Sequence, residues 1–111
     1  MKDDTQEVTG FTRKELEKMD LLFRKFTDHQ FLEWDILQHA IIQEGKNQVR
    51  KWGVQSHTLA EWLMYTTEEL GELAKAISEY IYRDGTVSEI YREAIQTATL
   101  ALKIAEMIFM D

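Results

Sequence analysis

The sequence contains no cysteine and no proline among its 111 residues. Without cysteine, disulfide frameworks and thiolate metal sites are excluded. Without proline, only five glycines remain as strong breaks between helices. No stretch is apolar over the roughly 20 residues that a membrane-spanning helix needs, and residues 1–4 lack the apolar run of a secretory signal. We therefore expect a cytoplasmic chain that does not enter a membrane.

Several kinds of catalytic and binding site are missing as well. The sequence has no Gly-rich phosphate loop, no zinc-ligand spacing and no Ser-His-Asp or Cys-His pattern. Its formal net charge of -7 argues against a nucleic-acid partner, because phosphate backbones are bound by clustered Lys and Arg. An acidic chain can still bind triphosphates through bridging cations, and part of the acidity would then belong to a metal site.

Three Thr-x-x-Glu sequences predict helix starts, because the hydroxyl and the carboxylate satisfy orphan amide groups reciprocally. They begin at Thr12, Thr58 and Thr86. A fourth start is expected in residues 27–30, with one bent helix over residues 12–52 as the alternative. Gly53 and Gly85 stand where C-terminal caps belong. Because no alternating strand pattern occurs, we predict a single all-α domain over residues 1–111, with the first ten residues frayed.

The predicted helix over about residues 59–83 carries two different faces. An apolar stripe at helical spacing is expected to form the core. Its members are Leu59, Leu63, Leu70, Leu73, Ala74, Ile77 and Ile81. A second strip mixes aromatic and acidic residues, namely Trp62, Tyr65, Glu69, Glu72 and Ala76. The second strip suits a base or sugar beside a metal-held triphosphate, although Trp62 and Tyr65 also fit the edge of a core. Gly71 costs about 1 kcal/mol relative to alanine in a helix, and close packing by a neighbour would explain it.

The predicted helix over about residues 87–110 is apolar nearly all round, which favours burial on two sides. One side holds Ile90, Ala94, Ala101, Ile104 and Ile108. The other holds Tyr91, Ile95, Ala98, Leu102, Ala105 and Phe109. In such a short chain the second side is expected to meet another subunit, so we predict at least a dimer.

The most informative motif is acidic. Residues 68–72 read Glu-Glu-Leu-Gly-Glu, and after residues 73–92 the sequence continues Glu93-Ala-Ile-Gln96. Residues three apart lie side by side on a helix, so Glu69 and Glu72 can share one ion. Two such carboxylates repel by roughly 3 kcal/mol at about 5 Å and an effective dielectric near 20, which a divalent cation would reverse. By itself the cluster also fits a solvated helix face.

The Glu-Glu-x-x-Glu element, its spacer and the second acidic helix together resemble the MazG-like all-α nucleoside triphosphate pyrophosphohydrolases. The resemblance includes residues 48–57 and 61–63 and covers about residues 38–110. It implies a four-helix bundle that assembles as a dimer or tetramer. It also implies that Mg²⁺, or Mn²⁺ in its place, serves the hydrolysis of an NTP or dNTP to the monophosphate and pyrophosphate. The family's second element ends in Asp, where this sequence has Gln96.

The resemblance and the helical positions of the residues together suggest individual roles. The expected metal ligands are Glu69, Glu72, Glu93 and, through its carbonyl oxygen, Gln96. Glu68 and Glu72 are both candidates for the base that takes a proton from water, and the sequence does not choose between them. Substrate contacts are expected from Gln48, Lys51, Trp52, Gln55, His57, Trp62, Tyr65 and Lys103. The simpler alternatives are that Trp52 plugs a helix junction, His57 makes a local hydrogen bond and Lys103 is solvated.

Two further functions fit the same sequence. The chain can be a non-catalytic nucleotide-binding or interaction module that kept the fold, an alternative that the neutral Gln96 supports. It can also be a helical-bundle assembly protein in which the acidic cluster is coincidental, and nucleotides should then have no effect on its thermal stability.

Overall fold

Four α-helices follow one another in the part of the chain that the structure describes, residues 10–29 and 33–110 of a computed structural model. They are α2 (Arg13–His29), α3 (Trp34–Trp52), α4 (Leu59–Tyr82) and α5 (Val87–Phe109). No β-strand occurs in these ranges, which confirms the predicted all-α class. The expectation of a frayed start lies, apart from Gly10, outside the described residues.

Two of the three predicted capping boxes are complete. The Thr12 hydroxyl accepts from the Glu15 amide and the Glu15 carboxylate accepts from the Thr12 amide. The same two bonds join Thr58 and Glu61 at the start of α4. At α5 the Thr86 hydroxyl accepts from the Glu89 amide, but the Glu89 carboxylate instead accepts from the Arg92 guanidinium at 2.6 Å. The helix start was predicted correctly there, while the reciprocal bond was not.

The start of α3 differs from both predictions. α2 continues through Thr27, and α3 begins at Trp34 after the N-cap Glu33. A start in residues 27–30 and a single bent helix over residues 12–52 are therefore both wrong. The acidic group at the true start is Asp35 in the first turn, where the positive end of the helix dipole favours a negative charge.

The two predicted glycine caps have different physical reasons. Gly53 does cap α3, because its φ of 75° lies in the left-handed region that favours glycine and its amide donates to the Val49 carbonyl. The C-cap residue of α4 is Arg83 and not Gly85, although the Gly85 amide also donates to the Glu79 carbonyl, at 3.0 Å. Gly85 is required for space, since a Cβ there would lie 2.7 Å from the carbonyl carbon of Glu79.

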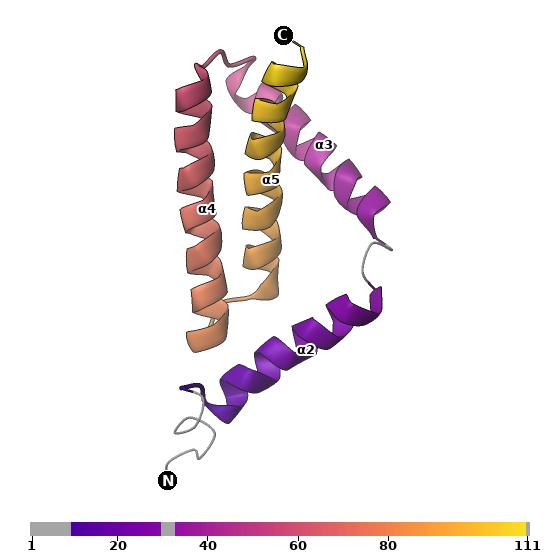
Figure 1. The fold of residues 1–111 in the computed structure, drawn as a ribbon, viewed down its shortest axis with the longest axis vertical. Coiled ribbons are helices and arrows are strands. Elements are labelled where there is room, and N and C mark those ends of the chain that lie inside the picture. Colours follow the sequence, from indigo (N-terminus) through magenta and orange to yellow (C-terminus); the bar gives the residue numbers. More distant parts are fainter. Residues whose placement is uncertain (1–9, 30–32, 111) are drawn as a thin grey trace.

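The helices form a hairpin with two additions (Figure 1). α4 and α5 run side by side and make the most extensive contact, α3 crosses α5, and α2 extends away from this layer. α2 is attached at the C-terminal end of α4, where the Lys18 ammonium donates to the Tyr80 carbonyl at 2.7 Å. The Phe11 ring also stacks with that of Tyr82 there. The opposite end of the hairpin, where α3 meets α4 and α5, contains most of the residues predicted to bind substrate.

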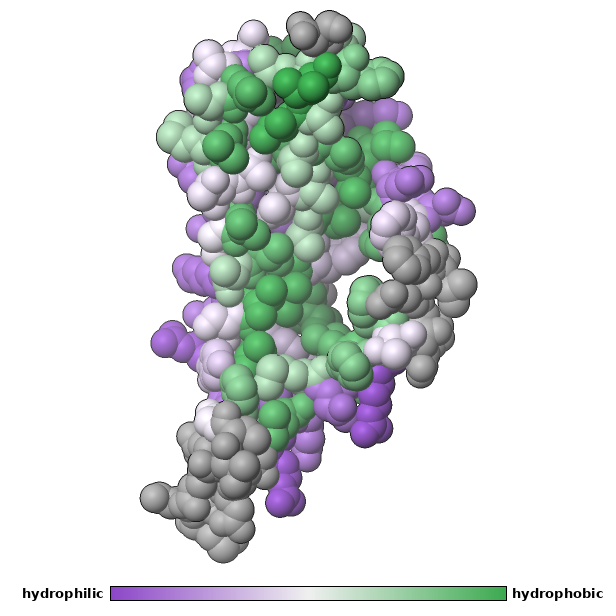
Figure 2. Space-filling model, viewed as in Figure 1, coloured by the Kyte–Doolittle hydropathy of each residue, from purple (hydrophilic) through white to green (hydrophobic). Residues whose placement is uncertain are grey.

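The predicted core stripe of α4 lies largely on the surface. Leu63 and Leu70 are 60% and 54% exposed, whereas Trp62 in the adjoining strip is 7% exposed and is the one buried apolar residue of the described part. α4 therefore turns its aromatic and acidic strip, and not its leucines, toward α5. We call Leu59, Leu63, Leu70 and Ile77 the outer α4 stripe. Figure 2 shows hydrophobic residues exposed along the hairpin.

α5 is packed on two sides within one chain, by α4 and by α3. The side that we assigned to a second subunit is thus partly covered by α3, although Leu102 and Phe109 remain 52% and 89% exposed. Among the described residues, no helix is both long and apolar enough to cross a membrane.

Candidate functional site

Two carboxyl groups from different helices meet at the centre of the hairpin. Glu93 on α5 is 9% exposed, and Glu69 on α4 is half-buried beside it. The Oε2 atoms of Glu69 and Glu93 are buried, and neither has a hydrogen-bond partner in the described part of the chain. Buried polar atoms are almost always paired, so these neighbouring carboxyl groups need compensation, either by a proton that Glu69 and Glu93 share in a hydrogen bond or by a ligand.

The charges around Glu69 oppose its ionisation. Burial raises the pKa of Glu69 above its ordinary value, and the neighbouring carboxyl group of Glu93 raises it further. Glu72 and Glu68 act in the same direction through their negative charges. All four glutamates of the two acidic elements therefore belong to one electrostatic cluster, with Glu69 at its centre.

The pair formed by Glu69 and Glu93 fits a divalent cation as a partial site. Mg²⁺ takes oxygen ligands and usually binds through one or two carboxylates together with water and substrate phosphates. Two orphaned carboxylate oxygens satisfy that requirement. No group of three acidic or imidazole side chains in the described residues converges into a closed metal cage. Glu69 and Glu93 would therefore hold such an ion, and the remaining ligands would come from substrate and water.

Most of the predicted substrate-binding residues line one cavity of about 400 Å³ beside this pair. We call it the aromatic cavity. Its walls come from the C-terminal half of α3, the loop that follows, the first half of α4 and the middle of α5. The lining residues that we predicted are Gln48, Trp52, Gln55, His57, Trp62, Tyr65, Glu68, Glu69 and Gln96. Glu44 and Leu100 complete the lining.

The aromatic rings of this cavity are arranged around His57. Its ring meets those of Trp62 and Tyr65 edge-on, with centroid distances of 4.8 and 4.9 Å. The His57 Nε2 atom lies 3.4 Å from the Gln55 side-chain oxygen, and Nδ1 lies 3.9 Å from a Glu61 carboxylate oxygen. These contacts fix the orientation of the imidazole, so the cavity presents a preformed aromatic wall.

Glu72 lies in a different cavity. Together with Glu93 it lines a space of about 530 Å³, which we call the charged cavity. This cavity also contains basic residues that the sequence analysis missed, namely Lys75, Arg83 and Arg92. They lie among further acidic residues, Glu79, Asp84 and Glu89, so the lining carries both signs of charge. The Arg92 guanidinium donates to Glu93 Oε1 at 3.3 Å. The predicted metal ligands are thus divided, with Glu69 and Gln96 on the aromatic side and Glu72 on the charged side.

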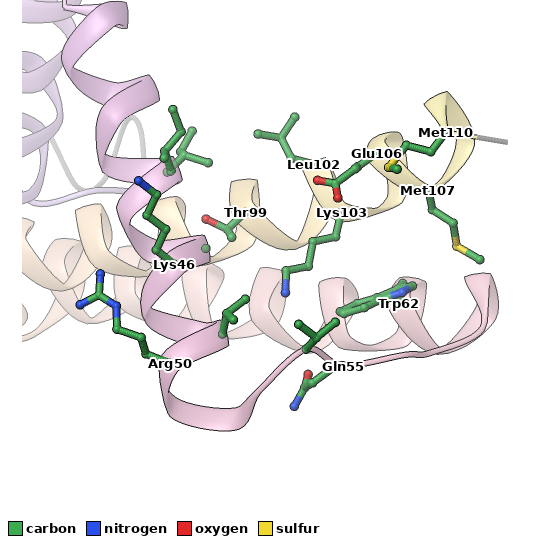
Figure 3. A pocket seen from close by; sticks show the side chains of 15 residues that line it. Lys46, Arg50, Gln55, Trp62, Thr99, Leu102, Lys103, Glu106, Met107 and Met110 are labelled. Atoms are coloured by element: carbon green, nitrogen blue, oxygen red, sulfur yellow. The ribbon is translucent and has the colours of Figure 1, made fainter.

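Two of the predicted substrate contacts lie outside both cavities. The Lys51 ammonium is 4.7 Å from the centroid of the Trp52 ring and lines neither cavity. Lys103 reaches from α5 toward Trp62, with its ammonium 5.0 Å from the indole centroid (Figure 3). Lys103 lines a third space, an apolar groove of about 830 Å³ between α3 and α5. A direct phosphate contact by either lysine is therefore not supported by its position.

Glu44 is the site residue that sequence reasoning missed most clearly. It lines the aromatic cavity from α3, and its Oε1 atom accepts from the Gln48 side-chain amide at 3.1 Å. The sequence does contain a signal for Glu44, because residues four apart share a helix face and Gln48 is itself a predicted substrate contact. Gly71 was overinterpreted, since a Cβ at that position would meet no atom within 4 Å in this chain. Close packing by a neighbour in the same chain does not explain it.

Comparison of the chain with protein-family models, with curated proteins and with solved structures gives no match. The resemblance to the MazG-like pyrophosphohydrolases thus stands on the motif residues themselves.

Proposed function

We propose that the protein is a Mg²⁺-dependent nucleoside triphosphate pyrophosphohydrolase of MazG-like type, which converts an NTP or dNTP to the monophosphate and pyrophosphate. The observation that carries this proposal is the orphaned carboxylate pair Glu69 and Glu93. It lies beside an aromatic cavity that is large enough for a nucleoside and a charged cavity that contains basic residues.

The nucleoside would occupy the aromatic cavity, where the exposed Trp52 and the half-buried Tyr65 offer ring surface for stacking. The phosphates would then extend past Glu69 and Glu93 toward the charged cavity, where the Lys75 ammonium, which makes no ion pair within the described residues, can neutralise part of the charge on the leaving pyrophosphate. The Arg92 guanidinium is already paired with Glu89 and Glu93. In this arrangement Lys75 takes the role that the sequence analysis gave to Lys103.

Glu69 and Glu93 would hold the cation, and Gln96 can add its amide oxygen from the aromatic side. When bound, Mg²⁺, or Mn²⁺ in its place, supplies charge neutralisation and a lowered pKa for an attacking water. Glu68 and Glu72 are both exposed and border the pair from opposite cavities. Either position allows the carboxylate to accept the proton that the water loses, so both remain candidate bases.

We also propose that the protein works as a homo-oligomer, a dimer or tetramer. The chain exposes 8846 Å² of surface, against roughly 6,400 Å² for a compact monomer of this size. Its radius of gyration is 17.5 Å, whereas a compact domain of this length has roughly 13 Å. The excess surface is on the scale of one partner's share of an obligate interface. The outer α4 stripe and the exposed end of α5 are the surfaces that a second copy would cover.

The proposal is tested by incubating the purified chain with a panel of NTPs and dNTPs and Mg²⁺, and by measuring released pyrophosphate. We expect Glu69→Gln and Glu93→Gln to abolish hydrolysis, because each removes a charge that holds the cation. Glu17→Gln, on the exposed surface of α2, is the matched control and should retain full activity. Robust activity in both site variants would place the chemistry elsewhere.

One observation favours a second candidate, a nucleotide-binding module without hydrolysis. The side chain on the aromatic side of the pair is the neutral Gln96, so this chain has one charge fewer there than the family pattern has. Mg²⁺-dependent nucleotide binding without any release of pyrophosphate would select this candidate.

A further inference from the structure

The α3 wall of the aromatic cavity offers a carboxylate as a hydrogen-bond acceptor. It presents the carboxylate of Glu44, held at Oε1 by the Gln48 amide. Within the described part of the chain Glu44 makes no other hydrogen bond or ion pair. Each carboxylate oxygen can accept two hydrogen bonds, so Oε2 and the second lone pair of Oε1 are both available to a ligand. An ionised carboxylate accepts hydrogen bonds and donates none.

This carboxylate is separated in function from the metal pair. It comes from a different helix, α3, and lines the aromatic cavity, whereas Glu93 of the metal pair lines the charged cavity. It also lies among the rings that would stack on a base. Its position in the cavity therefore suits recognition of the base better than binding of a cation.

The nucleobases differ in what they offer to a carboxylate. Guanine presents two adjacent donors, N1–H and the exocyclic 2-amino group, which match the two oxygens of one carboxylate. Adenine and cytosine each place a ring acceptor next to their amino group, and uracil and thymine flank their single N–H with two carbonyl oxygens. In those four bases at least one lone pair would face the negative charge, which disfavours binding.

We propose that the aromatic cavity selects guanine nucleotides, and that Glu44, oriented by Gln48, reads the N1–H and 2-amino groups of the base. This inference rests on the proposed function for the nucleotide itself and adds the identity of the base. Glu44 is here a specificity-determining residue, while Glu69 and Glu93 keep their role at the phosphates.

The test uses binding without turnover. Affinities of dGMP, dIMP, dAMP and dCMP are measured by calorimetry with Mg²⁺ present; dIMP differs from dGMP only by lacking the 2-amino group. We expect dGMP to bind at least about tenfold more tightly than dIMP, as a charge-assisted hydrogen bond implies. Glu44→Gln should remove that difference. The matched control is Glu33→Gln at the start of α3, an exposed carboxylate away from the cavity, which should keep it.

The outcomes separate the two proposals. Preference for dGMP without any dGTP hydrolysis supports the base assignment and removes the hydrolase. Hydrolysis of dGTP, dITP and dATP with equal kcat/KM, together with equal monophosphate affinities, overturns the base assignment and leaves the hydrolase standing. If Glu44→Gln weakens all nucleotides equally and also weakens Mg²⁺ binding, Glu44 serves the metal and the assignment to guanine is wrong.

Discussion

The inner and outer faces of α4 carry opposite kinds of side chain. Toward α5, α4 places Glu69 against the buried Glu93, with oxygen atoms that have no partner in the described residues. Toward solvent, it leaves Leu63 and Leu70 more than half exposed. An isolated helical hairpin gains stability from the reverse arrangement, with leucines inside and carboxylates outside.

The two faces of α4 differ in the kind of compensation that each one needs. Burying an unpaired carboxylate opposes folding unless a cation or a proton compensates the charge. Exposing an apolar stripe forgoes roughly 25 cal/mol for each Å² that a partner would cover. Under the proposed function, a cation and a nucleotide would compensate the inner face, and a second copy of the chain would cover the outer face.

The largest expected effect, a loss of the oligomer, comes from placing a charge on the outer face of α4. Leu63→Glu places a charge in the outer α4 stripe, and we expect it to dissociate the oligomer, because a buried unpaired charge opposes association by several kcal/mol. The adjacent Met64→Glu is the matched control. Met64 is similarly exposed, at 52% against 60% for Leu63, but points about 100° away around the helix.

Light scattering coupled to gel filtration measures both variants. We expect wild type and Met64→Glu to have the same multiple of the chain mass, and Leu63→Glu to have the mass of one chain. A wild-type mass equal to a single chain would show that the exposed leucines have no copy of this chain as their partner.

A smaller effect, on the melting temperature, is expected from removing the charge of Glu69 on the inner face of α4. The raised pKa of Glu69 means that the folded state prefers the protonated carboxyl. Stability from this group is fully present below the ordinary value of 4.5 and is lost as the pH rises through the raised pKa. Without metal, Glu69→Gln should therefore melt at the wild-type temperature at about pH 4 and above it at about pH 7.5.

Scanning calorimetry across this pH range, with and without Mg²⁺, measures the effect. Added Mg²⁺ should stabilise the wild type near neutral pH and leave Glu69→Gln almost unchanged. The Glu17→Gln control should follow the wild type at every pH. If Glu69→Gln is less stable than wild type at about pH 7.5 without metal, its carboxylate is already compensated within the protein.

Local sequence signals predicted the local structure well. Thr-x-x-Glu at Thr12 and Thr58 fixed two helix starts, because capping depends on residues three apart and not on tertiary contacts. Gly53 was recognisable as a cap for the same reason. The start of α3 was missed because Glu33 makes no side-chain capping bond, so the usual signal is absent.

Tertiary orientation was not predictable in the same way. Helical periodicity showed that α4 has an apolar stripe and an aromatic and acidic strip, but not which of them faces α5. Trp62 and Leu63 are adjacent in sequence, yet one is buried and the other is exposed. Glu44 was missed because its helix joins the site only through the crossing of α3 over α5.

A carboxylate introduced at position 96 is expected to change Mg²⁺ affinity at the inner face. Gln96 borders the aromatic cavity with Glu69, and its amide can offer a neutral oxygen to a cation. We expect Gln96→Asp to tighten Mg²⁺ binding several-fold in the absence of nucleotide, because a carboxylate adds a full charge. Calorimetric titration of wild type and variant with Mg²⁺ measures this. Equal affinities would mean that position 96 does not contact the ion, and that Glu69 and Glu93 hold it from the protein side without its help.

The smallest expected effect concerns Gly71, between the two faces. Glycine within a helix is less stable than alanine by about 0.5–1 kcal/mol, and a Cβ at position 71 meets no atom within 4 Å in this chain. Gly71→Ala should therefore raise the melting temperature by about 4 °C if solvent lies there in the assembled protein. Ala74→Gly on the same helix, a comparably small and exposed position, should lower it by a similar amount. A lower melting temperature for Gly71→Ala, together with a loss of oligomer mass, would instead place a second chain against this glycine and extend the interface beyond the outer α4 stripe.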